Sequence, residues 1–148
     1  MNSTKKIWAW VGVAIVVIIV VVAFVWRPAK KSAAPVPVFA PQGQLTPNFP
    51  TDLILDPQAQ IGSSYSINYD AKTNLYTAQW NSSSSLVLLY NEYETYLGSH
   101  AFTVTSASGA TSASKLAAVY AMSIHANVNV TIAAQGKGSQ VTISYAAH

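Results

Sequence analysis

The chain has 148 residues, of which 51% are hydrophobic, 9% are charged and none is cysteine, so disulfides, thiolate metal sites and thiol nucleophiles are excluded. Its formal net charge of +3 is unevenly distributed, because five of the eight basic residues precede residue 32. Residues 45–148 carry three lysines and five acidic residues, a formal net charge of −2. Nucleic-acid binding requires clustered Lys and Arg and is therefore not expected.

An apolar run, residues 7–26, follows a short N-terminal tail of residues 1–6. The run has 20 residues with no charge and no proline, and a helix of that length spans about 30 Å, the thickness of the hydrocarbon core of a bilayer. It predicts a single transmembrane helix whose partner is the lipid bilayer. Tryptophans and basic residues that anchor such a helix at its ends are Trp8, Trp10, Trp26, Lys5, Lys6 and Arg27.

The alternative interpretation of this run is a cleaved signal peptide. A signal peptide has an apolar region of about 7–15 residues followed by a small-residue cleavage site, but this run is longer and Trp26-Arg27 ends it directly. An uncleaved signal-anchor is therefore predicted. Basic residues are nearly balanced on the two sides of the run, so the positive-inside rule does not decide its orientation. The Ser-, Thr-, Asn- and Tyr-rich C-terminal part favours an orientation with the C-terminal domain outside the cytoplasmic (inner) membrane.

All seven prolines lie between residues 28 and 57. Residues 27–44 are rich in proline and alanine, which predicts an extended linker, or stalk, with a rise of about 3 Å per residue. Prolines continue into residues 45–57, but this segment also carries Leu45, Phe49, Leu53, Ile54 and Leu55. We therefore expect residues 45–148 to form one domain, in which this first segment is an irregular arm that packs on the remainder.

Two strands and a helix are predicted in the first half of this domain. Apolar and polar residues alternate over 61–69 and 76–80, and the turn-forming sequence 70–74 joins them into a hairpin. Serines 82–85 offer N-caps for a helix that ends near Gly98. The apolar face of the helix has the spacing i, i+3, i+4, i+7 and i+11, and its members are Leu86, Leu89, Tyr90, Tyr93 and Leu97.

The second half of the domain predicts further strands. Residues 101–105 form one, and every even position from 116 to 134 is apolar, which indicates one long strand that bends or two segments that meet near Ser123. A helix over 113–120 is the alternative. A turn at 136–138 precedes a last strand over 141–145. One apolar sheet face and one amphipathic helix predict a two-layer α+β domain with an antiparallel sheet.

The helix and its exit strand resemble a pattern found in small, uncharacterised membrane-anchored or lipoprotein domains of bacteria. The pattern is Y-x-x-Y-x-x-x-L followed by G-W-x-V, and the residues similar to it are Tyr90, Tyr93, Leu97, Phe102 and Val104. His100-Ala101-Phe102 stands where the pattern has Gly-Trp. The resemblance covers most of residues 45–145 and implies an α+β fold and a membrane location, without catalytic residues.

No motif predicts a catalytic residue, a metal site or a cofactor. His100, His125 and His148 lack the spacing of metal ligands. Pro50 and Pro57 flank Asp52 and Asp56 and disfavour a helix there, so the two carboxylates are not expected to form an acid–base pair. The serines match neither G-x-S-x-G nor S-x-x-K. Triplets 2–4, 81–83 and 129–131 match the N-glycosylation pattern, which also arises by chance in a Ser- and Asn-rich chain.

The sequence therefore favours a noncatalytic, membrane-tethered, extracytoplasmic interaction or structural accessory domain with an unidentified partner in the cell envelope. The alternative is a ligand-binding module for a lipid, a glycan or a peptide. Its ligand would lie in a groove between helix and sheet or at an open sheet edge. A pocket lined by Trp80, Tyr90 or Tyr93 would favour this alternative, whereas a packed core there would count against it.

Overall fold

The computed structural model describes residues 34–107 and 109–148, and residues Pro35–His148 form one compact unit. The apolar run 7–26 and its flanking anchor residues lie outside the described residues. Within the described part, no helix has both the length and the apolar character that crossing a bilayer requires.

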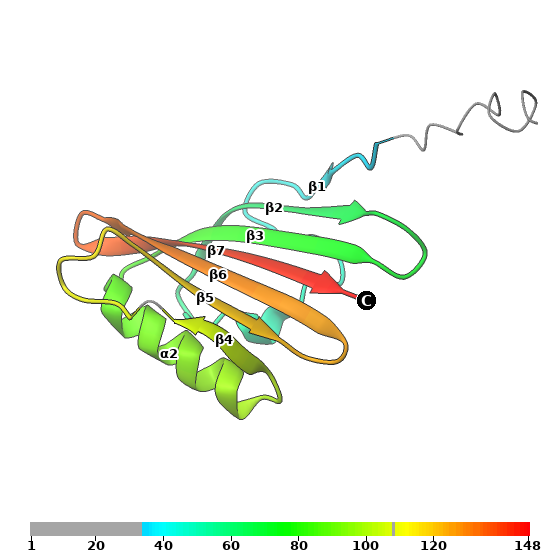
Figure 1. Ribbon diagram of the computed structural model, residues 1–148. Helices are drawn as coiled ribbons and strands as arrows, with labels where there is room; N and C mark the ends of the chain where they lie inside the picture. Colours follow the sequence, from blue (N-terminus) through cyan, green and yellow to red (C-terminus); the bar gives the residue numbers. More distant parts are fainter. Residues whose placement is uncertain (1–33, 108) are drawn as a thin grey trace, which may run out of the picture. The chain divides into compact units, whose positions relative to one another are not determined.

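A seven-stranded antiparallel sheet in the order β1-β2-β3-β7-β6-β5-β4 dominates the described chain, and one α-helix, α2, packs on it (Figure 1). This architecture confirms the predicted α+β domain with a helix on an antiparallel sheet. The elements are β1 (Val38–Phe39), the 3₁₀ turn η1 (Thr51–Leu53), β2 (Gln60–Asn68), β3 (Asn74–Ser82), α2 (Leu86–Ser99), β4 (Thr103–Ala107), β5 (Leu116–Met122), β6 (Ala126–Gln135) and β7 (Gly138–Ala147).

The helix α2 begins and packs as its sequence predicts. The Ser85 hydroxyl accepts a hydrogen bond from the Leu88 N–H at 3.4 Å and so caps the N-terminus. The predicted stripe is buried, and its members are Leu86, Leu89, Tyr90, Tyr93 and Leu97. The helix runs one residue past Gly98. Ala101, with φ of +61°, then occupies the left-handed position that usually takes glycine.

The hairpin of β2 and β3 is also confirmed. Its turn is closed by Asp70, whose Oδ1 accepts hydrogen bonds from the Lys72 and Thr73 N–H groups, each at 2.8 Å. These bonds favour the charged carboxylate and hold the pKa of Asp70 below its usual value. The charge of Asp70 therefore stabilises the turn itself.

The long alternating stretch forms two strands, β5 and β6, that meet at a turn over 123–125, so the helix considered for 113–120 is wrong. The expectation of one continuous apolar face is also wrong. In β6 the even positions from 126 to 132 are buried, but in β5 the odd positions Ala117, Val119 and Ala121 are buried, and Leu116 is 62% exposed. Residues that pair across neighbouring strands lie on the same side of the sheet, and Tyr120 pairs with Asn129. An even position of β5 therefore lies on the same side as an odd position of β6, because the length of the turn between them shifts the alternation by one residue.

The arm over 45–57 packs on the domain as predicted. Phe49 and Leu53 join the core, and the Tyr93 hydroxyl donates a hydrogen bond to the Leu53 carbonyl at 2.8 Å. Within the 27–44 range assigned to the linker, Val38 and Phe39 form β1, which pairs with β2. At least this end of the predicted linker is therefore part of the sheet.

Candidate interaction surfaces

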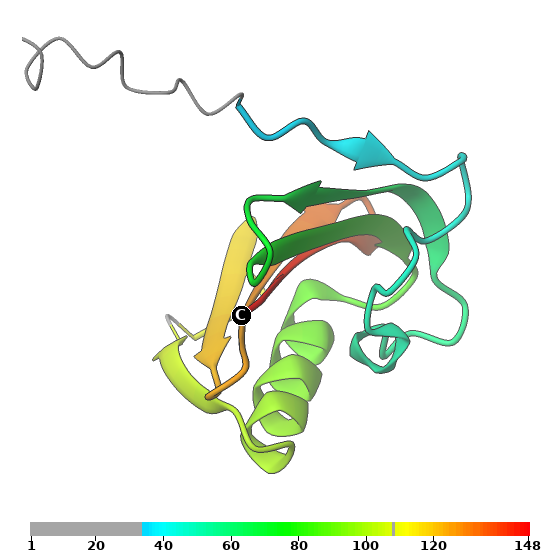
Figure 2. The same cartoon turned by 90° about the vertical axis from the view of Figure 1, so that its right-hand side faces the viewer.

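The sheet has two unlike sides. Helix α2 and the arm lie on the concave side, and no described element covers the opposite side (Figure 2). We call this opposite side the open face. Its members alternate along the strands with the buried core residues and share the register of the sheet. They are Ser63, Tyr65 and Ile67 of β2, Leu75, Thr77 and Gln79 of β3, Gln140, Thr142, Ser144 and Ala146 of β7, Asn127, Asn129, Thr131 and Ala133 of β6, and Leu116, Ala118, Tyr120 and Met122 of β5.

The open face contains no charged residue. The charged residues of the described chain lie in turns, on the arm or on α2. They are Asp52, Asp56, Asp70, Lys72, Glu92, Glu94, Lys115 and Lys137. The centre of the open face consists of hydroxyl and amide side chains, which both donate and accept hydrogen bonds. It is therefore suited to a polar but neutral partner.

One row of paired residues crosses six of the seven strands, and it adds Phe39 of β1 to the open face. From β1 to β5 it runs through Phe39, Tyr65, Thr77, Ser144, Asn129 and Tyr120. We call this set the cross-strand row. The Phe39 and Tyr65 rings lie 5.3 Å apart at one end, and Tyr120 lies at the other. Four strand spacings of about 4.8 Å separate Tyr65 from Tyr120, roughly 19 Å in all.

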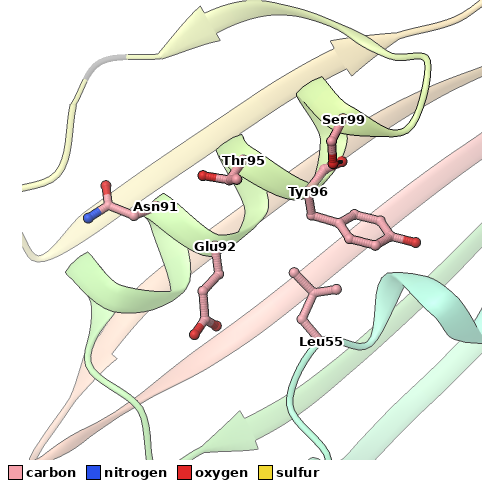
Figure 3. A pocket seen from close by; sticks show the side chains of 6 residues that line it. All are labelled: Leu55, Asn91, Glu92, Thr95, Tyr96 and Ser99. Atoms are coloured by element: carbon pink, nitrogen blue, oxygen red, sulfur yellow. Dashed lines mark hydrogen bonds between the residues drawn. The ribbon is translucent and has the colours of Figure 1, made fainter.

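A second candidate surface is a shallow hollow of about 530 Å³ between α2 and the arm, which we call the α2 groove (Figure 3). Its lining residues are Leu55, Asn91, Glu92, Thr95, Tyr96 and Ser99. Leu55 from the arm faces the exposed side of α2, where Glu92 contributes the single formal charge of this lining.

Tyr96 organises one end of the α2 groove. Its hydroxyl donates a hydrogen bond to Oδ2 of Asp52 at 3.0 Å, and its ring stacks on the His100 imidazole with centroids 3.9 Å apart. Burial raises the pKa of Tyr96, and the Asp52 carboxylate raises it further. The phenol therefore stays protonated at neutral pH. The Ser99 hydroxyl donates to the Tyr96 carbonyl at 2.9 Å and lies 3.0 Å from Nδ1 of His100, which itself lies 2.8 Å from the same carbonyl.

The acidic and histidine residues considered in the sequence lie in separate places: Asp52 and His100 both contact Tyr96, whereas His125 and His148 adjoin through their backbones. Asp56 accepts hydrogen bonds from the Ser82 hydroxyl and the Gln58 N–H, whereas Asp52 binds Tyr96. His125 lies in the β5–β6 turn, where its carbonyl accepts from the His148 N–H at 3.0 Å. Across residues 34–107 and 109–148, no group of three His, Cys, Asp or Glu side chains is placed to hold a metal ion.

The residues that would line a pocket under the alternative ligand-binding interpretation lie in the core. Trp80, Tyr90 and Tyr93 are each 2% exposed or less, and none of them lines the α2 groove. The space between helix and sheet is therefore filled at these positions, which counts against a ligand there. Trp80 Nε1 is buried without a hydrogen-bond partner.

Sequence reasoning missed the cross-strand row, although the polar odd positions of β6 pointed to a solvent-facing side. The row depends on which strands are neighbours and in what register, and these pairings are long-range. Comparison with known proteins found no match among family models, curated proteins or solved structures.

Proposed function

We propose that the protein is a noncatalytic interaction or structural accessory domain, tethered to the cytoplasmic membrane through residues 7–26 and displayed on its outer side. The observation that carries this proposal is the open face. Protein interfaces are depleted of charged residues and enriched in Tyr and Phe relative to the rest of the surface. The open face has no charged residue, and its cross-strand row carries Phe39, Tyr65 and Tyr120 at its ends.

Residues 7–34 supply the tether in this proposal. The apolar run has the length of a bilayer span, and the proline-rich segment that follows holds the domain near the membrane. A tether of this kind raises the effective concentration of the domain for neighbouring molecules. Weak binding at the open face is then sufficient for association within the envelope.

Labelling of single introduced cysteines tests on which side of the membrane the domain lies, since the chain has no native cysteine. Gln42→Cys and Lys137→Cys place thiols at exposed positions of the domain. Both are expected to react with a membrane-impermeant maleimide in intact cells. Reaction only after lysis would place the domain in the cytoplasm and contradict the proposal.

A photo-crosslinking amino acid at Thr131 tests whether the open face meets a partner. The matched control places the same amino acid at Glu94, which is exposed on α2 outside the α2 groove. Crosslinked products in membranes are expected from position 131 and not from position 94. Equal products from both positions, or none from either, would argue against an interaction at the open face.

A second candidate function is ligand binding in the α2 groove. A hollow of about 530 Å³ has the size of small-molecule sites, although it is open to solvent. Native mass spectrometry of protein extracted from membranes would detect a bound lipid, glycan or peptide. Thr95→Trp, which fills the groove, should abolish the bound mass, whereas Glu94→Trp should keep it. Protein without any bound mass would dismiss this candidate.

A further inference from the structure

The chemistry of the cross-strand row identifies a class of partner. We propose that the open face binds a neutral polysaccharide, laid across the strands with sugar rings on Tyr65 and Tyr120. This inference rests on the proposed function, because it names the partner of the same open face.

The central residues match the hydrogen bonding of sugar hydroxyls. In the cross-strand row, Ser144 is partly exposed and Asn129 beside it is exposed, whereas Thr77 is only 6% exposed and its hydroxyl lies 3.5 Å from that of Ser144. The neighbouring row pairs Gln79 with Thr142 and Thr142 with Thr131. Each of these side chains donates and accepts, as a sugar hydroxyl does. Two parallel rows therefore offer a hydrogen-bonding strip across three central strands.

The aromatic residues supply the second part of carbohydrate recognition. An aromatic ring carries negative charge density on its face, which attracts the polarised C–H groups of a sugar ring. Phe39 is 66% exposed beside Tyr65, and Tyr120 is partly exposed at the other end. The roughly 19 Å between Tyr65 and Tyr120, four strand spacings, exceeds a single sugar and requires a chain of several.

The same observations disfavour other partners. Anionic polymers gain no electrostatic attraction from a face without Lys or Arg. A peptide that adds as a strand needs free backbone groups, but the backbones of β3, β7 and β6 are paired on both sides. A membrane surface or a second copy of the chain would favour an apolar centre, whereas this centre consists of hydroxyls and amides. Among these classes of partner, charge and hydrogen bonding together favour a neutral sugar polymer.

Co-sedimentation tests this inference with the full chain in phosphatidylcholine nanodiscs. The probes are insoluble cellulose, chitin, starch granules, xylan and β-1,3-glucan, with empty nanodiscs as the background. Retention is expected on at least one neutral polymer. It should persist in about 0.5 M NaCl, because a contact without charges is not screened by salt. Retention lost at that salt concentration would overturn the inference.

Matched variants locate the contact. Tyr65→Ala and Tyr120→Ala should each weaken binding roughly tenfold, as the loss of an aromatic contact does. Tyr96→Ala removes a ring from the α2 groove and should leave binding unchanged. Asn129→Asp places a charge in the row and should weaken binding severalfold, whereas Asn91→Asp places the same charge on α2 and should not. If the alanine variants unfold, Asn129→Asp decides, because it keeps the shape of the side chain.

Two outcomes would overturn the inference. One is no retention on any neutral polymer, and the other is equal weakening by the α2 variants. A protein crosslinked at Thr131 without polysaccharide retention would reject this inference and leave the proposed function standing. Maleimide labelling only after lysis would reject the proposed function by a separate route.

Discussion

The two sides of the sheet are built from alternate residues of the same strands, yet they carry unlike chemistry. On β7, Ile143 is fully buried in the hydrophobic core, while Ser144 next to it lies on the open face. On β6, buried Val130 is adjacent to exposed Asn129. The inner residues hold the fold together by apolar burial. The outer residues contribute little apolar burial, so their composition is free to serve binding.

The largest expected effect tests this division directly. Ile143→Ala removes a fully buried side chain and should lower the free energy of unfolding by about 2–5 kcal/mol. Ser144→Ala, one residue further on the open face, should change it by about 0.5 kcal/mol or less. Urea denaturation followed by circular dichroism measures both variants. A Ser144→Ala loss as large as that of Ile143→Ala would show that the open face is also structural.

A second contrast compares a glycine of the sheet with a glycine of the helix. A Cβ built on Gly138 would lie 2.2 Å from the carbonyl oxygen of Ser82, a backbone atom that cannot rotate away. Gly138→Ala should therefore lower the free energy of unfolding by about 2–3 kcal/mol or more, as overpacking does. Nothing lies within 4 Å of a Cβ on Gly98. Gly98→Ala should raise the free energy of unfolding by about 0.5–1 kcal/mol.

Thermal unfolding of these two variants checks the signs. Opposite shifts of the melting temperature are expected from the same chemical change. A neutral Gly138→Ala would mean that β7 moves away from Ser82 at little cost, and the register of the open face would then be less firmly fixed than the structure indicates.

The sequence predicted the elements whose signals are local. The β2–β3 hairpin follows from alternation and the Asp70 turn, and α2 follows from Ser85 and a stripe with helical spacing. The burial of Phe49 in the arm was likewise expected. The hairpin and the helix depend on neighbours a few residues away, whereas the burial of Phe49 was expected from the apolar composition of the arm.

The features that the sequence did not predict depend on distant pairings. Leu116 of β5 has an even number, as the buried residues of β6 do, yet the turn over 123–125 places its side chain on the open face. The strand β1 has only two residues, too few to show a period. The cross-strand row requires β7 to lie between β3 and β6. No local pattern encodes that order, so the open face emerges only from the assembled sheet.

A third contrast separates the buried and exposed sides of α2. The Tyr93 hydroxyl donates to the Leu53 carbonyl in the core, whereas the Tyr96 hydroxyl donates to Asp52 beside the exposed α2 groove. Tyr93→Phe leaves a buried carbonyl without its partner and should lower the free energy of unfolding by about 1–3 kcal/mol. Tyr96→Phe should change it by about 0.5 kcal/mol or less, since water replaces the lost partner.

Chemical denaturation of these two variants also tests how the arm is held. A larger effect of Tyr96→Phe than of Tyr93→Phe would mean that Asp52, and not the Leu53 carbonyl, fixes the arm on α2.

The smallest expected effect concerns the charges that the open face excludes. Asp70 lies at the tip of the β2–β3 hairpin, and its pKa is lowered chiefly by the hydrogen bond from the Lys72 N–H and next by that from Thr73. A carboxylate with a lowered folded-state pKa contributes stability that is fully present above its unfolded pKa of about 3.9 and is lost as the pH falls through the folded value. Asp70→Ala should therefore be less stable than the native chain at pH 7, and the difference should shrink below that range. Melting temperatures across acidic pH measure this difference. A stability difference that stayed constant with pH would mean that Asp70 acts through the shape of its turn and not through its charge. The charge at the tip of the β2–β3 hairpin would then have no part in holding these two strands of the open face together.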